Sequence, residues 1–406
     1  MLHLPCPRAA LLALLAVPLV AAPAAAGRVP TTAAGPGGGP AHALPAAAPA
    51  GPAGAATAYL RLRASCLLAP AAGRALTAAC LPGAPLAGRE LLLAAGGRRL
   101  AAQLGHRLIG VSCRVTVGRV RLSVDGRTAT VGARAVTIVT WAATDGRTDT
   151  EGDGIDHVVV LVRRAGRWLV AADRYTSDLT PRLLQAAGAS RAAVADAARR
   201  LESASAAASP LAPAPAPAPP APLPAVQPAQ AATPAGAAPG YVAKLSYDRA
   251  AAKAYADRYA LSYNPTYVSF SSDCANFGSQ VMYAGGYPQF GSAYATGWWY
   301  DKSGTSTPAD DSYSHPWIAV ANQQAAWNAR YTDVVSAVSD LSAGDFVYYD
   351  WTGNGTWDHV AELVGTNSAG QRVVDAHTTD HYHVYWKLGT SATHYRFVHT
   401  RATIVI

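Results

Sequence analysis

A tract of alternating alanine and proline divides the chain. Residues 203–240, which include the run SPLAPAPAPAPPAPLPAVQPAQ, hold almost no large apolar side chains, and residues 29–57 are similarly rich in Gly, Ala and Pro. Neither segment has the apolar surface that a folded core requires, and proline-rich sequence favours the extended polyproline conformation. We therefore predict two separately folded domains, joined by a semi-rigid spacer.

The N-terminus has the parts of a secretory signal peptide. A cation at Arg8 precedes an apolar run over 9–20, and Ala24 and Ala26 follow at the A-x-A spacing of a cleavage site. The run is shorter than the roughly 20 residues of a membrane-spanning helix. We expect a secreted protein, extracellular or in the cell wall, with no membrane insertion after cleavage. The predicted organisation is a signal peptide (1–26), a disordered linker (27–57), an accessory domain (58–200), an Ala/Pro-rich linker (201–240) and a C-terminal domain (241–406).

Charge and cysteine content follow this division. Residues 241–406 contain 10 Lys and Arg against 14 Asp and Glu, so the net charge of +8 belongs to the first part of the chain. Basic charge in an exported protein suits an anionic cell wall, or it reflects an Arg-rich composition. An oxidising exterior favours disulfides. The spacing of Cys66 and Cys80 allows one bridge, whereas the linker separates Cys113 from Cys274.

The accessory domain has the pattern of helices followed by a sheet. Alternating apolar and polar residues surround turn sequences at 125–126 and 165–166, which indicate two hairpins. Helical sequence precedes them near 57–69 and 87–104. This order resembles the cone-shaped α+β fold of steroid isomerases and polyketide cyclases. That fold hosts many functions, so no activity follows from it.

Cys274 lies at the start of a predicted helix in the C-terminal domain. Ser272 or Asp273 is a suitable N-cap, and Cys274, Phe277 and Val281 fall on one apolar stripe. The partial positive charge of a helix N-terminus stabilises a thiolate, so we expect a lowered pKa for Cys274. A cysteine in this place is a candidate nucleophile.

Later strands carry a candidate base and its partner. The sequence between Asp345 and Asp380 predicts three strands, at 345–349, 359–364 and 372–377. Because side chains alternate along a strand, a histidine on one strand can face an acceptor on the next. His359 is the candidate base, Asp375 the candidate orienting carboxylate, and His377 the competitor for that role.

Residues 245–406 resemble a known family. The motif D-C-x-N-F-x-S-Q, then A-G-G, with D-H-V about 80 residues later and DAHTTD after it, resembles the bacterial family named the putative amidase domain. The segment GDFVYYD…WDHVAELVG is also similar to the papain-like NlpC and CHAP cell-wall hydrolases. The resemblance implies an α+β, papain-like domain in which a cysteine-bearing helix is followed by an antiparallel sheet. It implies these roles: Cys274 as nucleophile, His359 as base, Asp375 or else His377 as third residue, and Asp273, Asn276 and Gln280 as site-shaping residues.

The predicted function is amide hydrolysis by a thiol. We expect a secreted thiol amidohydrolase or peptidase that cleaves an amide bond in peptidoglycan or a peptide through Cys-His-Asp acyl transfer. One alternative is an acyltransferase or transpeptidase using the same pair. The other is a non-catalytic cell-wall binding protein with a degenerate site.

The remaining expectations concern cofactors and partners. Six of the eleven histidines lie from His359 onward, but no H-E-x-x-H or paired-cysteine spacing accompanies them, so we expect no metal and no cofactor. We also expect no nucleic-acid partner. D-H-V occurs a second time at 156–158, where His157 is expected to be a half-buried strand residue. The oligomeric state, the bond cleaved and the accessory domain's ligand stay open.

Overall fold

The computed structural model describes residues 51–143, 145–205, 244–302, 308–328 and 330–405. The predicted signal peptide, most of the first linker, and residues 206–240 of the Ala/Pro-rich linker lie outside these ranges. All of the described residues belong to one compact unit. In the described part of the chain, no helix combines the length and hydropathy needed to cross a bilayer.

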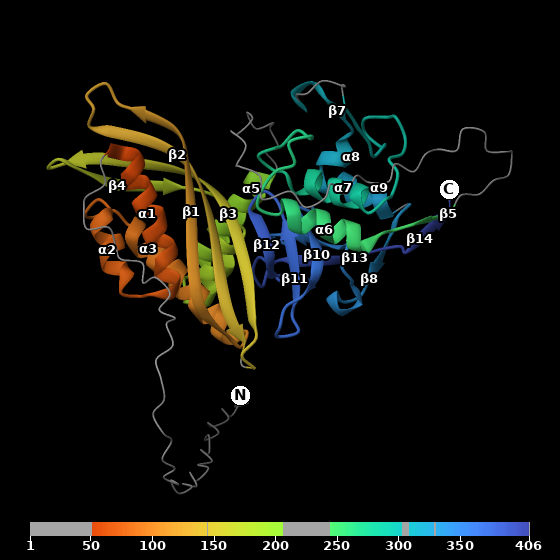
Figure 1. The fold of residues 1–406 in the computed structure, drawn as a ribbon, viewed down its shortest axis with the longest axis horizontal. Coiled ribbons are helices and arrows are strands. Elements are labelled where there is room, and N and C mark those ends of the chain that lie inside the picture. The colour runs from red at the N-terminus through yellow and green to blue at the C-terminus, as the bar shows by residue number, and fades with distance from the viewer. Residues whose placement is uncertain (1–50, 144, 206–243, 303–307, 329, 406) are drawn as a thin grey trace, which may run out of the picture. The chain divides into compact units, whose positions relative to one another are not determined.

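The accessory domain consists of helices and four long strands (Figure 1). Its elements are α1 (Gly51–Leu68), α2 (Ala72–Ala79), α3 (Leu86–Gln103), β1 (His106–Leu122), β2 (Thr128–Ala143), β3 (Thr148–Arg164), β4 (Arg167–Arg174), α4 (Leu179–Ala187) and α5 (Arg191–Ser205). Both predicted hairpins and both predicted helices are present. Ala165 and Gly166 both have positive φ, as a two-residue hairpin turn requires. The first helix begins at Gly51, within the segment expected to be a linker.

The C-terminal domain has short helices and a set of antiparallel strands. Its elements are β5 (Lys244–Ser246), α6 (Arg249–Tyr259), α7 (Cys274–Ala284), β6 (Tyr300–Asp301), η1 (Pro308–Asp310), β7 (Ser312–Tyr313), α8 (His315–Ile318), α9 (Val320–Asn328), β8 (Thr332–Val335), η2 (Val338–Asp340), β9 (Asp345–Asp350), β10 (His359–Thr366), β11 (Arg372–Ala376), β12 (Asp380–Tyr385), β13 (His394–Thr400) and β14 (Thr403–Val405). The predicted cysteine-bearing helix and the three predicted strands correspond to α7, β9, β10 and β11.

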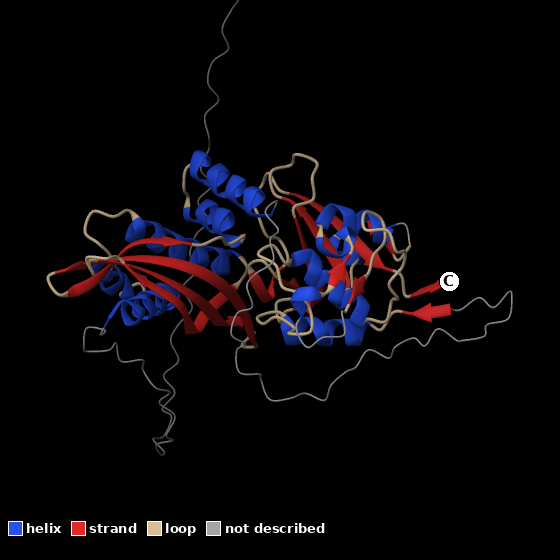
Figure 2. Cartoon of the chain, turned by 90° about the horizontal axis from the view of Figure 1, so that it is seen from above, coloured by secondary structure: helices blue, strands red, loops and turns tan. Residues whose placement is uncertain are grey.

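Among the described residues, ten strands form one large sheet. Its order is β1-β2-β3-β12-β11-β10-β9-β13-β8, with β4 also paired to β3, and the pairings are antiparallel. Strand β12 pairs with β3 through Asp380 opposite Gly154. Figure 2 shows the strands in red, with helices in blue beside them. The chain is therefore a mixed α and β structure built on a large antiparallel sheet.

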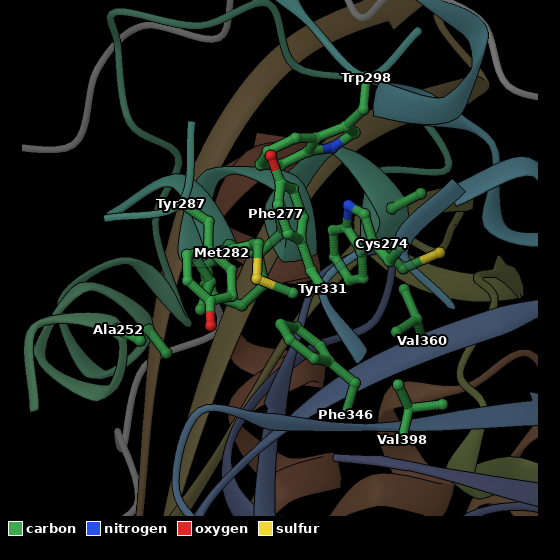
Figure 3. Packing of buried hydrophobic residues seen from close by; sticks show 14 of the residues in the cluster. Ala252, Cys274, Phe277, Met282, Tyr287, Trp298, Tyr331, Phe346, Val360 and Val398 are labelled. Atoms are coloured by element: carbon green, nitrogen blue, oxygen red, sulfur yellow. The ribbon is translucent and has the colours of Figure 1, made fainter. Parts of the chain in front are cut away.

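The two faces of the C-terminal strands bury different side chains. Phe346, Val360 and Val398 lie on the face covered by α7, where they pack with Cys274 and Phe277 (Figure 3). The other face buries a second cluster, which comprises Leu201, Leu341, Val347, Tyr349, Trp351, Ala361, Leu363, Val374, Ala376, Val384 and Leu388. Burial on both sides explains the uninterrupted apolar and aromatic run of residues 346–349 in β9.

The described cysteines are free thiols. Cys66, Cys80 and Cys274 are buried and Cys113 is partly buried, and none of the four is in a disulfide. The bridge that the spacing of Cys66 and Cys80 allows is therefore not formed in this structure.

We predict that Phe346→Ala destabilises the C-terminal domain by about 3–5 kcal/mol, because it leaves a cavity beneath α7. Phe346 is fully buried and its ring centroid lies 4.9 Å from that of Trp327. Val334→Ala is the control, because Val334 is exposed. Urea unfolding measures both variants; equal midpoints would contradict this description of the core.

Candidate active site

The start of α7 is held by a buried carboxylate. Asp273 occupies the predicted N-cap position, but its side chain accepts no hydrogen bond from a backbone N–H of the first turn of the helix. Instead, Oδ1 accepts from the backbone N–H of Phe270 at 2.8 Å and from the amide of Asn276 at 2.9 Å. Oδ2 lies 2.7 Å from Nδ1 of His377. Asp273 therefore ties the helix start to the segment after β11.

Thr378 supplies the oxygen that contacts the N-terminal end of α7. Its hydroxyl accepts hydrogen bonds from the backbone N–H groups of Asp273, at 2.9 Å, and Cys274, at 3.2 Å. Thr378 has a φ of 88°, an unfavourable conformation for a β-branched residue. Such strain is found at functional sites more often than elsewhere.

Burial is the largest influence on the pKa of the Cys274 thiol. Desolvation raises its pKa from 9.0 to about 11, and the polar groups of the Val360 backbone and the Thr378 side chain oppose that rise without cancelling it. The predicted lowering of this pKa is therefore wrong for the structure described here. The thiol is 2 % exposed, so loss of solvation outweighs the partial charge of the helix N-terminus.

His359 is the first residue of β10 and lies on the face opposite α7. Its ring stacks on Trp351 with a centroid distance of 5.3 Å, and it lies near Tyr349. Nε2 has no hydrogen-bond partner and stands 3.8 Å from Oδ2 of Asp178. Burial lowers the pKa of His359 to about 4, so the ring is neutral at pH 7.

The side chains of Cys274 and His359 lie on opposite faces of β10. Val360, which packs in the same buried cluster as Cys274, directly follows His359 in β10. Among the described residues, no hydrogen bond joins the side chains of Cys274 and His359. Thr378 connects the two places, because it contacts the helix start and also lines a small cavity beside His359. The cavity has a volume of about 10 Å³, room for about one water molecule.

Asp375 lies away from His359. In the register of β10 and β11 it pairs with Glu362, so its side chain shares the α7 face with Glu362 and Val360. Its Oδ1 accepts from the backbone N–H of His383 at 2.7 Å. Burial raises the pKa of Asp375 to about 7. Asp375 therefore contacts His383, and not His359 as expected.

A group of possible metal ligands surrounds Asp375. One ligand atom each from Asp257, Asp375 and His383 lies within 4.8 Å of the others. These residues come from α6, β11 and β12, and they are separate from the cysteine and from His359.

Both ring nitrogens of His377 have partners. Nδ1 bonds to Asp273, and Nε2 lies 2.8 Å from the carbonyl oxygen of Tyr259. The ring also stacks on Phe277 at a centroid distance of 4.0 Å. Nearby Asp380 and Asp273 raise the pKa of His377 against the effect of burial. In this structure His377 is the ionic partner of Asp273 and does not contact His359.

The other predicted site-shaping residues are buried in hydrogen-bond networks. Asn276 donates to the carbonyl of Val268 at 2.8 Å and accepts from the indole of Trp317 at 2.9 Å. Gln280 accepts from the hydroxyl of Tyr255 at 2.6 Å. These contacts position α7 against its surroundings.

Asp178 and His381 are site residues that sequence reasoning missed. Asp178 Oδ1 lies 2.5 Å from Nε2 of His381, while Oδ2 faces His359. The backbone N–H of Asp178 donates to Thr379 at 3.2 Å. Asp178 precedes α4 of the accessory domain, and no motif of the C-terminal domain points to it. His157, expected to be half-buried, is fully buried and pairs with Asp173 at 2.9 Å.

Comparison with known proteins supports an amidase assignment for the C-terminal domain. Residues 246–400 match the family model described as "Putative amidase domain". An uncharacterized protein of Bacillus subtilis (strain 168), YhbB, is 31 % identical over 168 residues, which cover 38 % of this chain and 50 % of that protein. The chain therefore spans about half the length of this relative.

One solved structure matches part of the chain. A protein of unknown function from Mycobacterium tuberculosis matches with 16 % identity and a TM-score of 0.22, covering 36 % of this chain and 88 % of that one. At that TM-score, no conclusion about fold follows. The chain contains a domain that is similar to amidases, and this similarity suggests a hydrolase.

The raised pKa of Cys274 predicts a pH-dependent stability. The folded-state pKa lies above the ordinary value, so the stabilisation is present below pH 9 and is lost as the pH rises from 9 to about 11. Relative to Cys274→Ser, we expect the wild-type free energy of unfolding to fall by on the order of 2 kcal/mol over this range. Urea unfolding at several pH values measures it. Parallel curves for the two proteins would show that the thiol is not desolvated.

Proposed function

We propose that residues 245–406 form a cysteine-dependent amidase or peptidase, with Cys274 as nucleophile and His359 as general base. One observation carries the proposal: Cys274, the first residue of α7, lies in the same buried cluster as Val360, the residue that directly follows His359 in β10 (Figure 3). The residues matched by the amidase family model include both side chains. A helix-start thiol and a neutral imidazole carried by the adjoining strand are the minimal set of groups for acyl transfer.

The proposed reaction is a two-step acyl transfer. His359 takes the thiol proton, and the sulfur attacks the amide carbonyl carbon to form a tetrahedral oxyanion. The C–N bond then breaks, and His359 gives its proton to the departing amine. In the second step His359 deprotonates a water molecule, which attacks the thioester. The acid product leaves and the thiol is restored.

The reactive state requires two local movements. The thiol and the imidazole must meet on one side of β10, since the ring of His359 stacks on Trp351 in the structure described. Catalytic contacts often tighten after substrate binds. The substrate's carbonyl oxygen would also replace the Thr378 hydroxyl as acceptor for the Cys274 N–H, the natural oxyanion donor at this helix start.

The proposed substrate is a peptide amide of the bacterial cell wall. Two considerations support it: the signal-like N-terminus, and the resemblance to papain-like NlpC and CHAP cell-wall hydrolases. The proposed papain-like arrangement and the secreted or cell-wall location rest on the same two considerations. An acyltransferase using the same cysteine is the second candidate, because both reactions share the thioester.

A muropeptide digest analysed by mass spectrometry tests the proposal. Wild-type protein in ¹⁸O-labelled water is expected to produce a new carboxylate that carries ¹⁸O. Cys274→Ser should lose at least roughly a thousandfold in rate and His359→Ala roughly 10²–10⁴-fold. His394→Ala is the control, because His394 is largely exposed.

Three outcomes of the digest contradict hydrolysis by this pair. Products that gain an added amine in place of ¹⁸O indicate the acyltransferase. Muropeptides that bind but stay intact indicate a non-catalytic cell-wall binding protein. Full activity in Cys274→Ser excludes the cysteine mechanism.

The third residue of the site is assigned by a pH profile. We propose that Asp178, which faces His359, is its positioning residue, rather than the predicted Asp375. The Asp178 carboxylate raises the pKa of His359 against burial. Asp178→Asn is therefore expected to lower kcat/KM about tenfold or more and to move the acid limb of its pH profile to lower pH. Asp375→Asn should leave that limb in place. A shift in Asp375→Asn alone would return the role to Asp375.

A further inference from the structure

A second cluster of ionisable groups lies beneath α6, apart from the cysteine and His359. Asp257 comes from α6, Asp375 from β11 and His383 from β12. His383 Nε2 lies 2.9 Å from Asp257 Oδ1, and the His383 backbone N–H donates to Asp375 Oδ1. We propose that Asp257, Asp375 and His383 bind a divalent transition-metal ion such as Zn²⁺ or Mn²⁺.

The spacing of the three ligand atoms suits one ion. They lie within 4.8 Å of one another. Metal–ligand bonds of about 2.0–2.2 Å allow two ligands of the same ion to be at most about 4.4 Å apart. A shift of about half an ångström therefore closes the group around an ion. An imidazole nitrogen with carboxylate oxygens favours Zn²⁺ or Mn²⁺ over Ca²⁺ and Mg²⁺, which prefer oxygen ligands throughout.

Unpartnered buried oxygens point independently to a cation. Asp375 Oδ2 has no hydrogen-bond partner, and neither carboxylate oxygen of Glu362 has one. Both side chains are at most 1 % exposed. Glu362 lies directly opposite Asp375 in the pairing of β10 with β11, so the two carboxyl groups are neighbours. Buried polar atoms are normally satisfied, so three orphan oxygens together indicate a missing partner.

The balance of charge leads to the same conclusion. The cluster and its neighbour Glu362 together hold three carboxyl groups. Among the described residues, Lys253 forms an ion pair with one of them, Asp257. The side chains of Asp375 and Glu362 are at most 1 % exposed, so water does not compensate their charge. A divalent ion compensates the same charge and satisfies the oxygens.

An ion has a path to this position. The side chains of Asp257 and His383 are 31 % and 28 % exposed, while Asp375 lies at the buried end. The ligands would fasten α6 to β11 and β12 two residues before Tyr259, whose carbonyl contacts His377. The site is thus structural, and it differs from the sequence-based expectation of no metal.

Isothermal titration and elemental analysis test the site on full-length protein stripped with a chelator. We expect one Zn²⁺ or Mn²⁺ per chain, with much weaker binding of Ca²⁺ and Mg²⁺. Asp375→Asn and His383→Ala should each weaken affinity at least about a hundredfold, because each removes a ligand. The ion should also raise the melting temperature of the wild type and of neither variant.

A second histidine–aspartate pair provides a matched control. His399 lies 2.9 Å from buried Asp345 and is 34 % exposed, close to the values for His383, but Arg249 already pairs with Asp345. His399→Ala should therefore bind the ion as the wild type does. Lys253→Met keeps every ligand and should bind at least as tightly.

Three results would overturn the metal site. The first is a wild-type protein that takes up neither ion. The second is equal affinity in Asp375→Asn and the wild type. The third is loss of binding in His399→Ala or in Lys253→Met. Circular dichroism of each variant identifies those that fail to fold. These readouts measure metal binding and stability rather than activity. A failure of the metal site therefore leaves the proposed amidase activity standing, and a failure of that activity leaves the metal site standing.

Discussion

The buried ion pair between Asp273 and His377 holds the candidate active site together. It joins the start of α7 to the end of β11, and the second nitrogen of His377 extends the link to the end of α6 through Tyr259. Loss of one partner from a buried pair typically costs about 3–5 kcal/mol. The pair fixes the turn that carries Thr378 against the backbone N–H groups of Asp273 and Cys274.

The thiol shows two opposing physical effects of different size. A helix N-terminus is worth roughly 0.3–1 kcal/mol to a nearby negative charge, up to about 2 in partly buried geometries. The pKa of Cys274 nevertheless rises from 9.0 to about 11, which corresponds to roughly 3 kcal/mol in favour of the neutral thiol. Burial therefore dominates in the closed site. Entry of substrate or water beside Cys274 would reduce the desolvation and let the helix start favour the thiolate.

Local sequence patterns predicted the elements well and their mutual placement poorly. The helix start at Cys274 and the strands beginning at Asp345, His359 and Arg372 follow from capping residues and alternation. Alternation also placed His359 and Ala361 on one face of β10. Alternation contains no information about the register between strands. In the structure Asp375 pairs with Glu362, so its side chain lies on the face of the sheet opposite His359.

Contacts between distant segments were beyond sequence reasoning for a related reason. Asp178 belongs to the accessory domain, whereas the family resemblance begins near residue 245, so no motif connected it with His359. The group of Asp257, Asp375 and His383 spans two strands and a helix, without the short spacing of common metal motifs. The effect of burial on the Cys274 pKa likewise depends on side chains that pack around it only in the fold.

A crystal structure of Cys274→Ser bound to a peptide amide tests the central claim most directly. The account predicts that the scissile carbonyl carbon lies about 3–3.5 Å from the serine oxygen. It also predicts that the His359 ring has left Trp351 to form a hydrogen bond with that oxygen. A peptide bound elsewhere, or a His359 ring still stacked on Trp351 with substrate in place, would contradict it.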